Sequence, residues 1–399
     1  MTWRDLRLAQ VAEVGPRDPS LSDDAPFVPM ASVEVGRRYP VSYERRGSRG
    51  GIRARGNDVL FARITPCLEN GKLAQLPADA EPTGGSTEFI VVRAGPELDP
   101  GFLYYWCASP AVRDRAESLM TGTTGRMRFA GVELADFRIW LPPMEEQRRI
   151  VDLLEDHLSR LEAAEQSIRR SLRRLSSLRD AVLSEAVELA SASPGAHVRA
   201  IGDLARVSSG LTPLKGNKAF YDGGTIPWIT SGDLHQGVIT EAKHFVTQAA
   251  LDETTLKLVP AGAILIAMYG EGKTRGTAAE LGIDAATNQA CAAVVLHDPD
   301  LRQWVRLVLD ANYSKLRRLA AGGVQPNLNQ SMVKAIEIPI PVPGVRVELL
   351  AHRTEFDDAR LRLQSELEIA RLHGARLGQS LLAAAFSGRL TGEREVAVA

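Results

Sequence analysis

The feature that most constrains this chain is an internal duplication at a spacing of about 200 residues. Segments of one half reappear in the other half with their order kept, which predicts two copies of one domain. The matching pairs are LRLAQVAEV at 6–14 with IGDLARVSS at 201–209, NDVLFAR at 57–63 with AGAILIA at 261–267, TGTTGRM at 121–127 with AGGVQPN at 321–327, and ADFRIWLPP at 135–143 with KAIEIPIPV at 334–342.

A long amphipathic helix pattern follows each copy. Apolar residues recur every seven positions at Leu154, Leu161, Ile168, Leu175 and Val182, and again at Leu349, Phe356, Leu363, Ala370, Leu377 and Ala384. A sustained seven-residue repeat gives a seam that faces another helix, so we expect these helices to pair with each other. Glu165 and Arg179 interrupt the second seam position, which suits a short, imperfect coiled coil. The alternative is that each apolar stripe packs on its own domain.

Turn signals then divide the chain. We expect an α+β fold with two similar mixed α/β domains related by pseudo-twofold symmetry, separated by two long helices in an antiparallel coiled coil. The expected parts are a first domain at 1–143, a first helix at 144–190, a linker at 191–198, a second domain at 199–343, and a second helix with a C-terminal segment at 344–391. A helix of about 45 residues is about 65 Å long. Two non-identical domains held at a fixed separation could each recognise a different short site on one extended polymer.

Composition narrows the class of protein. The 399 residues carry a net charge of -1, which argues against indiscriminate coating of nucleic acid. Residues 37–55 nevertheless hold seven arginines against Glu44, which predicts a positive patch or, alternatively, a solvated loop. The first residues, MTWRDLRLAQ, lack a leader pattern and no apolar run is long enough for a membrane span, so we expect a cytoplasmic protein. The cysteines lie too far apart in the sequence to indicate a disulfide framework or a zinc site; they are Cys67, Cys107 and Cys291.

Five motifs carry a resemblance to a known family. They are LPPMEEQRRIVDLLE at 141–155, GLTPLKGNKAFYDGGTIPWITSGDL at 210–234, ATNQACAAVV at 286–295, GGVQPNLNQ at 322–330 and SLLAAAFSGRLT at 380–391. Over essentially its whole length the chain resembles the specificity subunit of a type I restriction-modification system. The first helix keeps the Glu146-Gln147 start of that family, whereas PGVRVELLA at 343–351 lacks it, which makes partner docking at the second helix entrance less expected.

The resemblance implies both a function and partners. Each domain would be a target recognition domain that reads one half of a bipartite site in double-stranded DNA, and the helices would be spacer and docking surface. The implied partners are two copies of an adenine methyltransferase (modification) subunit and a restriction translocase subunit. The sequence contains no segment that holds a flipped adenine, no nuclease signature and no paired histidine spacing, so we expect no catalytic residue, cofactor or metal.

Side-chain chemistry selects candidate DNA contacts. Arginine and lysine reach phosphates or guanine edges, and asparagine and glutamine pair with adenine. Each candidate could instead cap a turn, and we expect Trp228 to be a core anchor and Asp233 to pin its own turn. The candidates are Arg45, Arg46, Arg49, Arg63, Lys72, Arg126 and Arg128 in the first domain, and Lys215, Asn217, Lys218, Tyr221, Tyr269, Lys273, Arg275, Gln325, Asn327 and Asn329 in the second.

The segment AMYGEGKTRG at 267–276 leaves an alternative open, because it fits a loose phosphate-loop pattern with Ala267 in place of the first glycine. A phosphate loop follows a strand and leads into a helix. Gly276 and Gly282 break the segment that follows, so we expect a tight hairpin that presents Tyr269, Lys273 and Arg275 to DNA, or a turn that merely closes. The other functions left open are a nucleotide-binding enzyme and a coiled-coil interaction protein that does not bind DNA.

Overall fold

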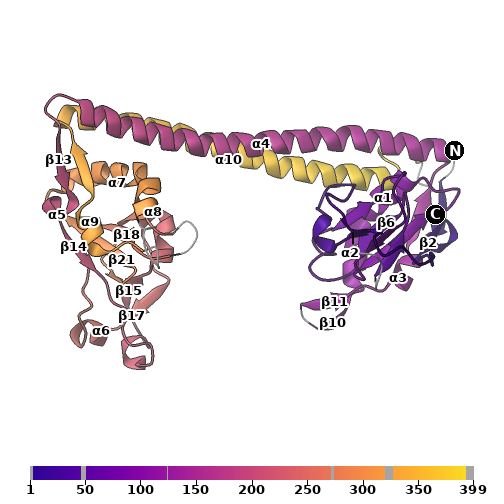
Figure 1. The fold of residues 1–399 in the computed structure, drawn as a ribbon, viewed down its shortest axis with the longest axis horizontal. Coiled ribbons are helices and arrows are strands. Elements are labelled where there is room, and N and C mark those ends of the chain that lie inside the picture. The colour runs from indigo at the N-terminus through magenta and orange to yellow at the C-terminus, as the bar shows by residue number, and fades with distance from the viewer. Residues whose placement is uncertain (1–2, 46–50, 124, 271–273, 320–326, 392–399) are drawn as a thin grey trace. The chain divides into compact units, whose positions relative to one another are not determined.

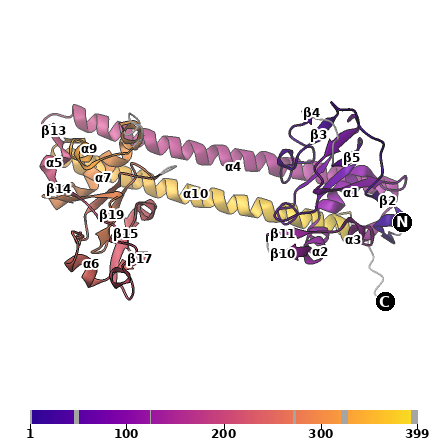
Figure 2. The ribbon, with the colours of Figure 1, turned by 60° about the horizontal axis from the view of Figure 1, so that its bottom comes forward.

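The computed structural model describes residues 3–45, 51–123, 125–270, 274–319 and 327–391. The chain divides into two compact units, Met1–Arg169 with Leu367–Ala399 and Arg170–Glu366. Both divisions fall inside the long helices α4 (Met144–Ala192) and α10 (Pro343–Phe386), which Figures 1 and 2 show. None of the described helices is long and apolar enough to cross a membrane.

Unit 1 is built on two four-stranded sheets. The first has the order β2-β9-β6-β7, all antiparallel, and the second has the order β4-β3-β8-β5 with β3 and β8 parallel. Two further antiparallel pairs are β1-β12 and β10-β11. The strands are β1 (Arg4–Arg7), β2 (Ala12–Val14), β3 (Pro26–Val28), β4 (Glu44–Arg45), β5 (Ile52–Ala54), β6 (Val59–Ala62), β7 (Leu73–Gln75), β8 (Thr83–Gly85), β9 (Phe89–Ala94), β10 (Thr121–Thr123), β11 (Arg126–Arg128) and β12 (Arg138–Leu141).

Helices of unit 1 pack on one face of the first sheet, where Phe102, Val112 and Leu134 share a hydrophobic cluster with Val59 and Phe61 of β6. Asp99 begins α1 as its N-cap, because its Oδ1 accepts hydrogen bonds from the backbone N–H groups of Gly101 and Phe102 at 2.8 and 3.0 Å. The short helices are η1 (Leu8–Gln10), η2 (Met30–Ser32), α1 (Pro100–Ala108), α2 (Pro110–Ser118) and α3 (Gly131–Ala135).

Unit 2 repeats the core of this topology, with β16 added at the edge of the first sheet and, among the described residues, no counterpart of β5 in the second. Its sheets have the orders β14-β21-β18-β19-β16 and β17-β15-β20, with β15 and β20 parallel, and β13 pairs with β22. The strands are β13 (His197–Ala200), β14 (Ala205–Ser209), β15 (Ile226–Ile229), β16 (Val238–Ile239), β17 (His244–Val246), β18 (Ile264–Ala267), β19 (Ala278–Leu281), β20 (Ala286–Thr287), β21 (Cys291–Leu296) and β22 (Glu337–Ile340). The helices are α5 (Ile201–Leu204), η3 (Lys218–Phe220), η4 (Ser231–Gln236), α6 (Gln248–Asp252), η5 (Pro299–Leu301), α7 (Arg302–Ala311), α8 (Tyr313–Leu319) and α9 (Gln330–Lys334).

The central strand of each unit explains why its sequence is a continuous apolar run. In β6, Val59 and Phe61 belong to one hydrophobic cluster and Leu60 and Ala62 to another, because successive side chains point to opposite faces. In β18, Ile264 and Ile266 are divided from Leu265 and Ala267 in the same way. Both faces of each central strand are therefore buried. The repeated strand orders and this shared burial confirm the predicted duplication.

The long helices pack against each other in opposite directions within each unit. In unit 1, Ile150 and Leu154 near the start of α4 share a cluster with Leu381 and Ala385 near the end of α10. In unit 2, Leu183 and Ala186 near the end of α4 share a cluster with Leu349 and Leu350 near the start of α10. Opposite ends meet in both units, so the antiparallel pairing is confirmed.

The seven-residue pattern locates the interface on α4 better than on α10. Leu154 is fully buried, and Leu161, Ile168, Leu175, Val182, Leu349 and Phe356 are half-buried, but Leu363 and Leu377 keep 44% and 52% of their surface exposed. At the end of α10 the position that faces α4 is Gly378, where a Cβ atom would lie 3.6 Å from Leu158 and 3.7 Å from Leu161. The residue that faces α4 is therefore one position after the one we expected, Leu377. The pattern missed it because glycine does not stand out as an apolar residue.

Candidate nucleic-acid interface

Two loops lie side by side at the end of the central strand of unit 1. One follows β6, and the other is the β10-β11 hairpin. The backbone N–H of Phe129 donates to the carbonyl of Arg63 at 2.8 Å, and the N–H of Thr65 donates to the carbonyl of Met127 at 3.1 Å. The Thr65 hydroxyl oxygen also accepts from the N–H of Met127 at 2.8 Å. These bonds fix the hairpin to the loop.

The corresponding segments of unit 2 follow β18 and precede α9, and residues 271–273 and 320–326 within them lie outside the described residues. The N–H of Leu328 donates to the carbonyl of Met268 at 3.0 Å, which repeats the bond between Phe129 and Arg63 in unit 1. Tyr269, just after Met268, is 37% exposed. Four candidate contacts, Arg46, Arg49, Lys273 and Gln325, lie outside the described residues.

The segment at 267–276 connects two antiparallel strands. β18 pairs with β19 in antiparallel register, with Ile266 opposite Ala278. A phosphate loop would instead lead from a strand into a helix. The described residues on the far side of the turn, 274–281, form a turn and a strand and contain no helix. The antiparallel connection of a hairpin is confirmed, and the presentation of Tyr269, Lys273 and Arg275 to DNA stays a prediction. The geometry gives no support to a nucleotide-binding loop.

The basic candidates of unit 1 differ in what they already contact. Arg128 donates to both carboxylate oxygens of Glu88 at 3.1 and 2.6 Å, and this hydrogen bonding is the main cause that holds the pKa of Glu88 below its usual range. The Lys72 ammonium donates to the carbonyl of Met30 at 3.0 Å. Arg45 lies on the other sheet and forms an ion pair with Glu81 at 3.7 Å. Arg126, in contrast, is exposed on its hairpin.

Several candidates of unit 2 have structural contacts. Asn217 accepts from the N–H of Ala219 at 3.1 Å and begins η3, and Asn329 accepts from the N–H of Met332 at 2.9 Å and begins α9. The Tyr221 hydroxyl donates to the carbonyl of Pro213 at 2.6 Å. These side chains cap turns or close loops, which is the alternative that sequence left open. Among the remaining candidates, Lys215 and Lys218 are exposed, and Arg275 and Asn327 are half-buried.

Two expected structural residues have the roles that we predicted. Trp228 is 8% exposed and its indole N–H donates to the carbonyl of Leu211 at 3.2 Å, so it is a core anchor. Asp233 accepts from the N–H and the hydroxyl of Thr230 at 2.9 and 2.8 Å, which pins its own turn.

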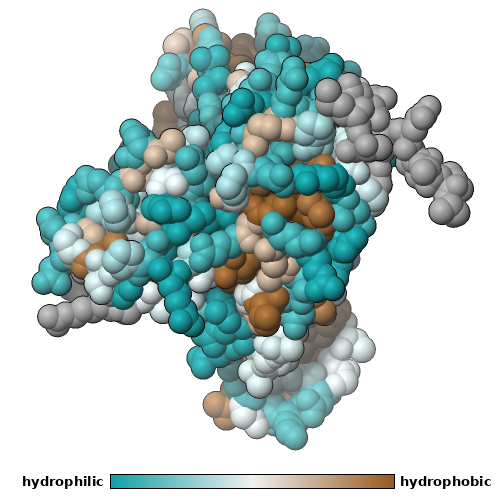
Figure 3. All heavy atoms as spheres, turned by 90° about the vertical axis from the view of Figure 1, so that its right-hand side faces the viewer, coloured by the Kyte–Doolittle hydropathy of each residue, from teal (hydrophilic) through white to brown (hydrophobic). Residues whose placement is uncertain are grey.

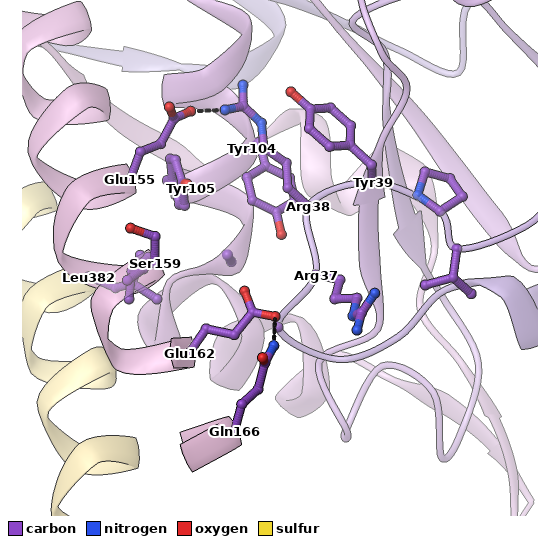
Figure 4. A pocket seen from close by; sticks show the side chains of 15 residues that line it. Arg37, Arg38, Tyr39, Tyr104, Tyr105, Glu155, Ser159, Glu162, Gln166 and Leu382 are labelled. Carbon is purple, nitrogen blue, oxygen red and sulfur yellow. Dashed lines mark hydrogen bonds and ion pairs between the residues drawn. The ribbon is translucent and has the colours of Figure 1, made fainter. Parts of the chain in front are cut away.

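The arginine-rich run at 37–55 does not form one uniform patch in its described part. Arg38 lies among the rings of Tyr39, Tyr104 and Tyr105, 5.5 to 5.7 Å from their centroids, and pairs with Glu155 of α4 (Figure 4). Burial is the main cause that raises the pKa of Tyr105 to about 12. These groups line a hollow of about 790 Å³ between the domain and α4. Arg38 therefore attaches the first domain to its long helix, a role that a run of charges does not reveal.

Unit 2 attaches its domain to the long helices with different chemistry. Asp310 of α7 pairs with Arg306 at 3.1 Å, with Arg179 of α4 at 3.2 Å and with Arg353 of α10 at 3.5 Å. Asp357 of α10 pairs in turn with Arg353 at 3.3 Å. An ionic network therefore takes the place that arginine and tyrosine rings take in unit 1.

Gln147 has a structural role that the sequence did not disclose. Its side chain is fully buried, its Oε1 accepts from the N–H of Asp99 at 2.7 Å, and its Nε2 donates to the carbonyls of Glu97 and Pro142, both at 2.9 Å. All of these bonds lie within unit 1. Its amide is therefore fully engaged and holds the start of α4 against α1, so it offers no surface to a partner.

One face of the molecule is drawn in Figure 3. Hydrophilic side chains cover most of it, and apolar side chains gather in a few patches. Scattered apolar side chains on a mostly polar surface are normal for globular domains and by themselves mark no interface.

Comparison with known proteins identifies the family. The family model described as "Type I restriction modification DNA specificity domain" matches residues 1–170 and again residues 195–350. A specificity subunit of the type I restriction enzyme EcoR124I/EcoR124II from Escherichia coli is 25% identical over 162 residues, and that of HindI from Haemophilus influenzae is 30% identical over 151 residues. These alignments cover 40% and 37% of this chain, and only 40% and 32% of the respective relatives.

Solved structures share the fold over nearly the whole chain. A structure from a study of complex assembly and conformational transition of the type I R-M system has a TM-score of 0.82 at 21% identity, covering 98% of both chains. The HsdS subunit from Thermoanaerobacter tengcongensis has a TM-score of 0.61 at 22% identity, covering 97% of both chains. Because the family model matches both halves of a chain whose two domains repeat one topology, this protein belongs to the family of type I restriction-modification DNA specificity proteins.

Proposed function

We propose that this chain is the non-catalytic DNA-recognition subunit of a type I restriction-modification complex in the cytoplasm. Each domain reads one half of a bipartite site in double-stranded DNA. The observation that supports the proposal is a backbone hydrogen bond that recurs at the same place in both domains, from Phe129 to Arg63 and from Leu328 to Met268. A duplicated scaffold with different side chains on its equivalent loops is suited to reading two different short sequences.

The side chains at these loops match the chemistry of DNA. Arg63, Arg126 and Tyr269 lie on or next to the paired loops, where cationic and hydrogen-bonding groups suit phosphates and base edges. Residues 1–143 and 199–343 would be the two target recognition domains, and 144–190 and 344–391 the helical parts with 191–198 as the linker.

The helices are the proposed docking surface for two modification subunits and, through them, a restriction translocase. α4 contains 49 residues, which corresponds to about 73 Å of helix. Such a length exceeds what packing on a single small domain requires. Because Gln147 is buried, partner contacts would fall on the exposed faces of the helices and not on this side chain.

Mapping methylated adenines in host DNA tests the proposal. Cells that contain this chain should methylate a split sequence with a constant spacer, and cells that lack it should lose methylation at that sequence while other methylated motifs persist. An unchanged methylation pattern after loss of the chain would contradict the proposed function. The mass of the complex purified through a tag on this chain tests the expected two modification subunits.

A further inference from the structure

We propose that the β10-β11 hairpin of the first domain enters the major groove of DNA and divides its arginines among three tasks. Arg126 contacts a base edge, Arg63 at the root of the hairpin contacts a backbone phosphate, and Arg128 holds the hairpin in place. This proposal rests on the proposed function, since it names the element and the residues by which one half-site is read.

The hairpin is exposed to an extent that core packing does not explain. Of its six described strand residues, only Met127 is half-buried, and the other five are exposed on both faces. Figure 1 shows it projecting from the sheets of unit 1. A two-stranded ribbon is marginally stable by itself in water. Its position therefore depends on its root, where Thr65 bonds to Met127 and Arg128 bonds to Glu88.

The strands are closely paired. Gly122, opposite Met127, has a φ of +134°, and a Cβ atom there would lie 2.7 Å from the carbonyl oxygen of Arg126. Only glycine fits this position without moving the opposite strand. The ribbon is therefore thin, with its two strands at the usual separation of about 4.8 Å. The major groove of B-DNA is about 12 Å wide and admits a two-stranded ribbon as it is, whereas the minor groove, at about 6 Å, takes strands only when the DNA is bent or the groove is widened.

The two arginines of β11 differ in how much of their guanidinium group is available to bind DNA. The guanidinium of Arg128 is bound by both oxygens of Glu88, so it positions the hairpin and has little left to offer a base. Arg126 is exposed, and no carboxylate among the described residues forms an ion pair with it. An arginine on such a ribbon can donate two hydrogen bonds to O6 and N7 of guanine, which is the commonest specific contact of this side chain.

Arg63 has the features of a phosphate contact. Its Nε–H is buried and has no hydrogen-bond partner among the described residues, although a buried donor normally has one. It lines a hollow of about 760 Å³ together with Arg17, Arg53 and Asp18. The acids nearby are already engaged, because Asp18 is bound by Arg93 and Glu88 by Arg128. A phosphate oxygen that enters this hollow would supply an acceptor to the Arg63 guanidinium and balance the excess of positive charge.

The experiment uses the complex purified from its host through a tag on this chain, with a library of randomised DNA duplexes as the probe. Arg126→Ala should reduce the preference for guanine at one base pair of one half-site by about 5- to 140-fold and leave the other half-site unchanged. R126K keeps the charge but not the two-pronged geometry, and it should lose the same preference. Because Arg126 is exposed, both variants should keep the thermal unfolding profile of the wild type.

Arg63→Ala gives the complementary signature. Affinity should fall equally for all sequences, the selected motif should stay the same, and the slope of log affinity against log salt should decrease by about 0.9. Arg37→Ala is the control, because Arg37 is an exposed arginine of the same domain that pairs with Glu34 and lies outside the hairpin. It should change neither the motif nor the slope.

The outcomes separate this proposal from the function on which it rests. A wild-type complex that selects no motif would refute the proposed function itself. If the wild type selects a split motif and both Arg126 variants select it unchanged, the function stands and the assignment of the hairpin is wrong. The assignment is also overturned if R126A lowers only the salt slope, because Arg126 would then contact a phosphate, or if R63A leaves the slope unchanged.

Discussion

At the residue scale, the side chain of Gln147 joins the first domain to α4 through three buried hydrogen bonds. Gln147→Leu should leave the Asp99 N–H and the carbonyls of Glu97 and Pro142 without partners inside the protein. Since each orphaned buried group costs about 1–3 kcal/mol, we expect a loss of at least about 3 kcal/mol in the free energy of unfolding. Urea unfolding followed by tryptophan fluorescence measures it.

The control for Gln147 is Gln166 on the same helix. Its side chain is exposed and makes one bond, to Glu162 at 3.3 Å. Gln166→Leu should therefore change the unfolding free energy by less than about 0.5 kcal/mol. Equal losses for the two variants would show that the buried bonds of Gln147 are not what matters.

A second prediction at the residue scale concerns pH. The hydrogen bond from Arg93 is the main cause that lowers the pKa of Asp18. A carboxylate with a lowered pKa stabilises the folded state above its unfolded pKa of about 3.9, and this contribution is lost as pH falls through the lower folded value. The difference in unfolding free energy between the wild type and Asp18→Asn should therefore be constant from pH 7 to pH 5 and shrink below about pH 4. A difference that stays constant down to pH 3 would contradict the ion pair.

At the scale of elements, the displaced seam of α10 makes a testable contrast. Leu161 of α4 lies against Gly378, whereas Leu377 is 52% exposed. Leu161→Glu should part the helices within unit 1 and cost about 1–3 kcal/mol, because it places a charge in the interface. Leu377→Glu should cost less than about 0.5 kcal/mol. Urea unfolding followed by circular dichroism at 222 nm distinguishes them, and equal costs would favour the unshifted seven-residue register.

In unit 2, ion pairs attach α7 to the two long helices. Asp310 is 10% exposed at its side chain and is shared by Arg306, Arg179 and Arg353. Asp310→Asn leaves these guanidinium groups close together without their common carboxylate, which should cost about 3–5 kcal/mol. Asp180→Asn, an exposed acid on α4, is the control and should be nearly neutral. An equally small effect of both variants in urea unfolding would show that the network does not hold α7 to the long helices.

For the whole molecule, the duplication makes the two domains separately replaceable. Exchange of residues 1–143 for the first domain of another family member should change one half of the methylated sequence and leave the other half unchanged. The physical reason is that each unit has its own clusters of buried residues. Methylation mapping after the exchange checks this, and a change in both halves would mean that the domains do not read independently.

The sequence by itself determined the duplicated topology and the two long helices. Burial on both faces imposes a continuous apolar run on β6 and β18, and helix packing imposes a seven-residue repeat on α4, so these elements are visible without a structure. Local capping chemistry similarly made the turn role of Asp233 predictable.

Only the tertiary structure decided which side chains are free to act. Arg126 and Arg128 look equivalent in the sequence, yet Glu88, 40 residues away from Arg128, engages one and not the other. Gln147 is buried because the chain segments at Glu97 and Asp99 fold against it, and Gly378 takes the place expected for Leu377 because a close contact needs a small residue. Hydropathy and spacing record burial and local period. They do not indicate which distant residue becomes a hydrogen-bond or ion-pair partner, because the tertiary fold determines which residues come close together.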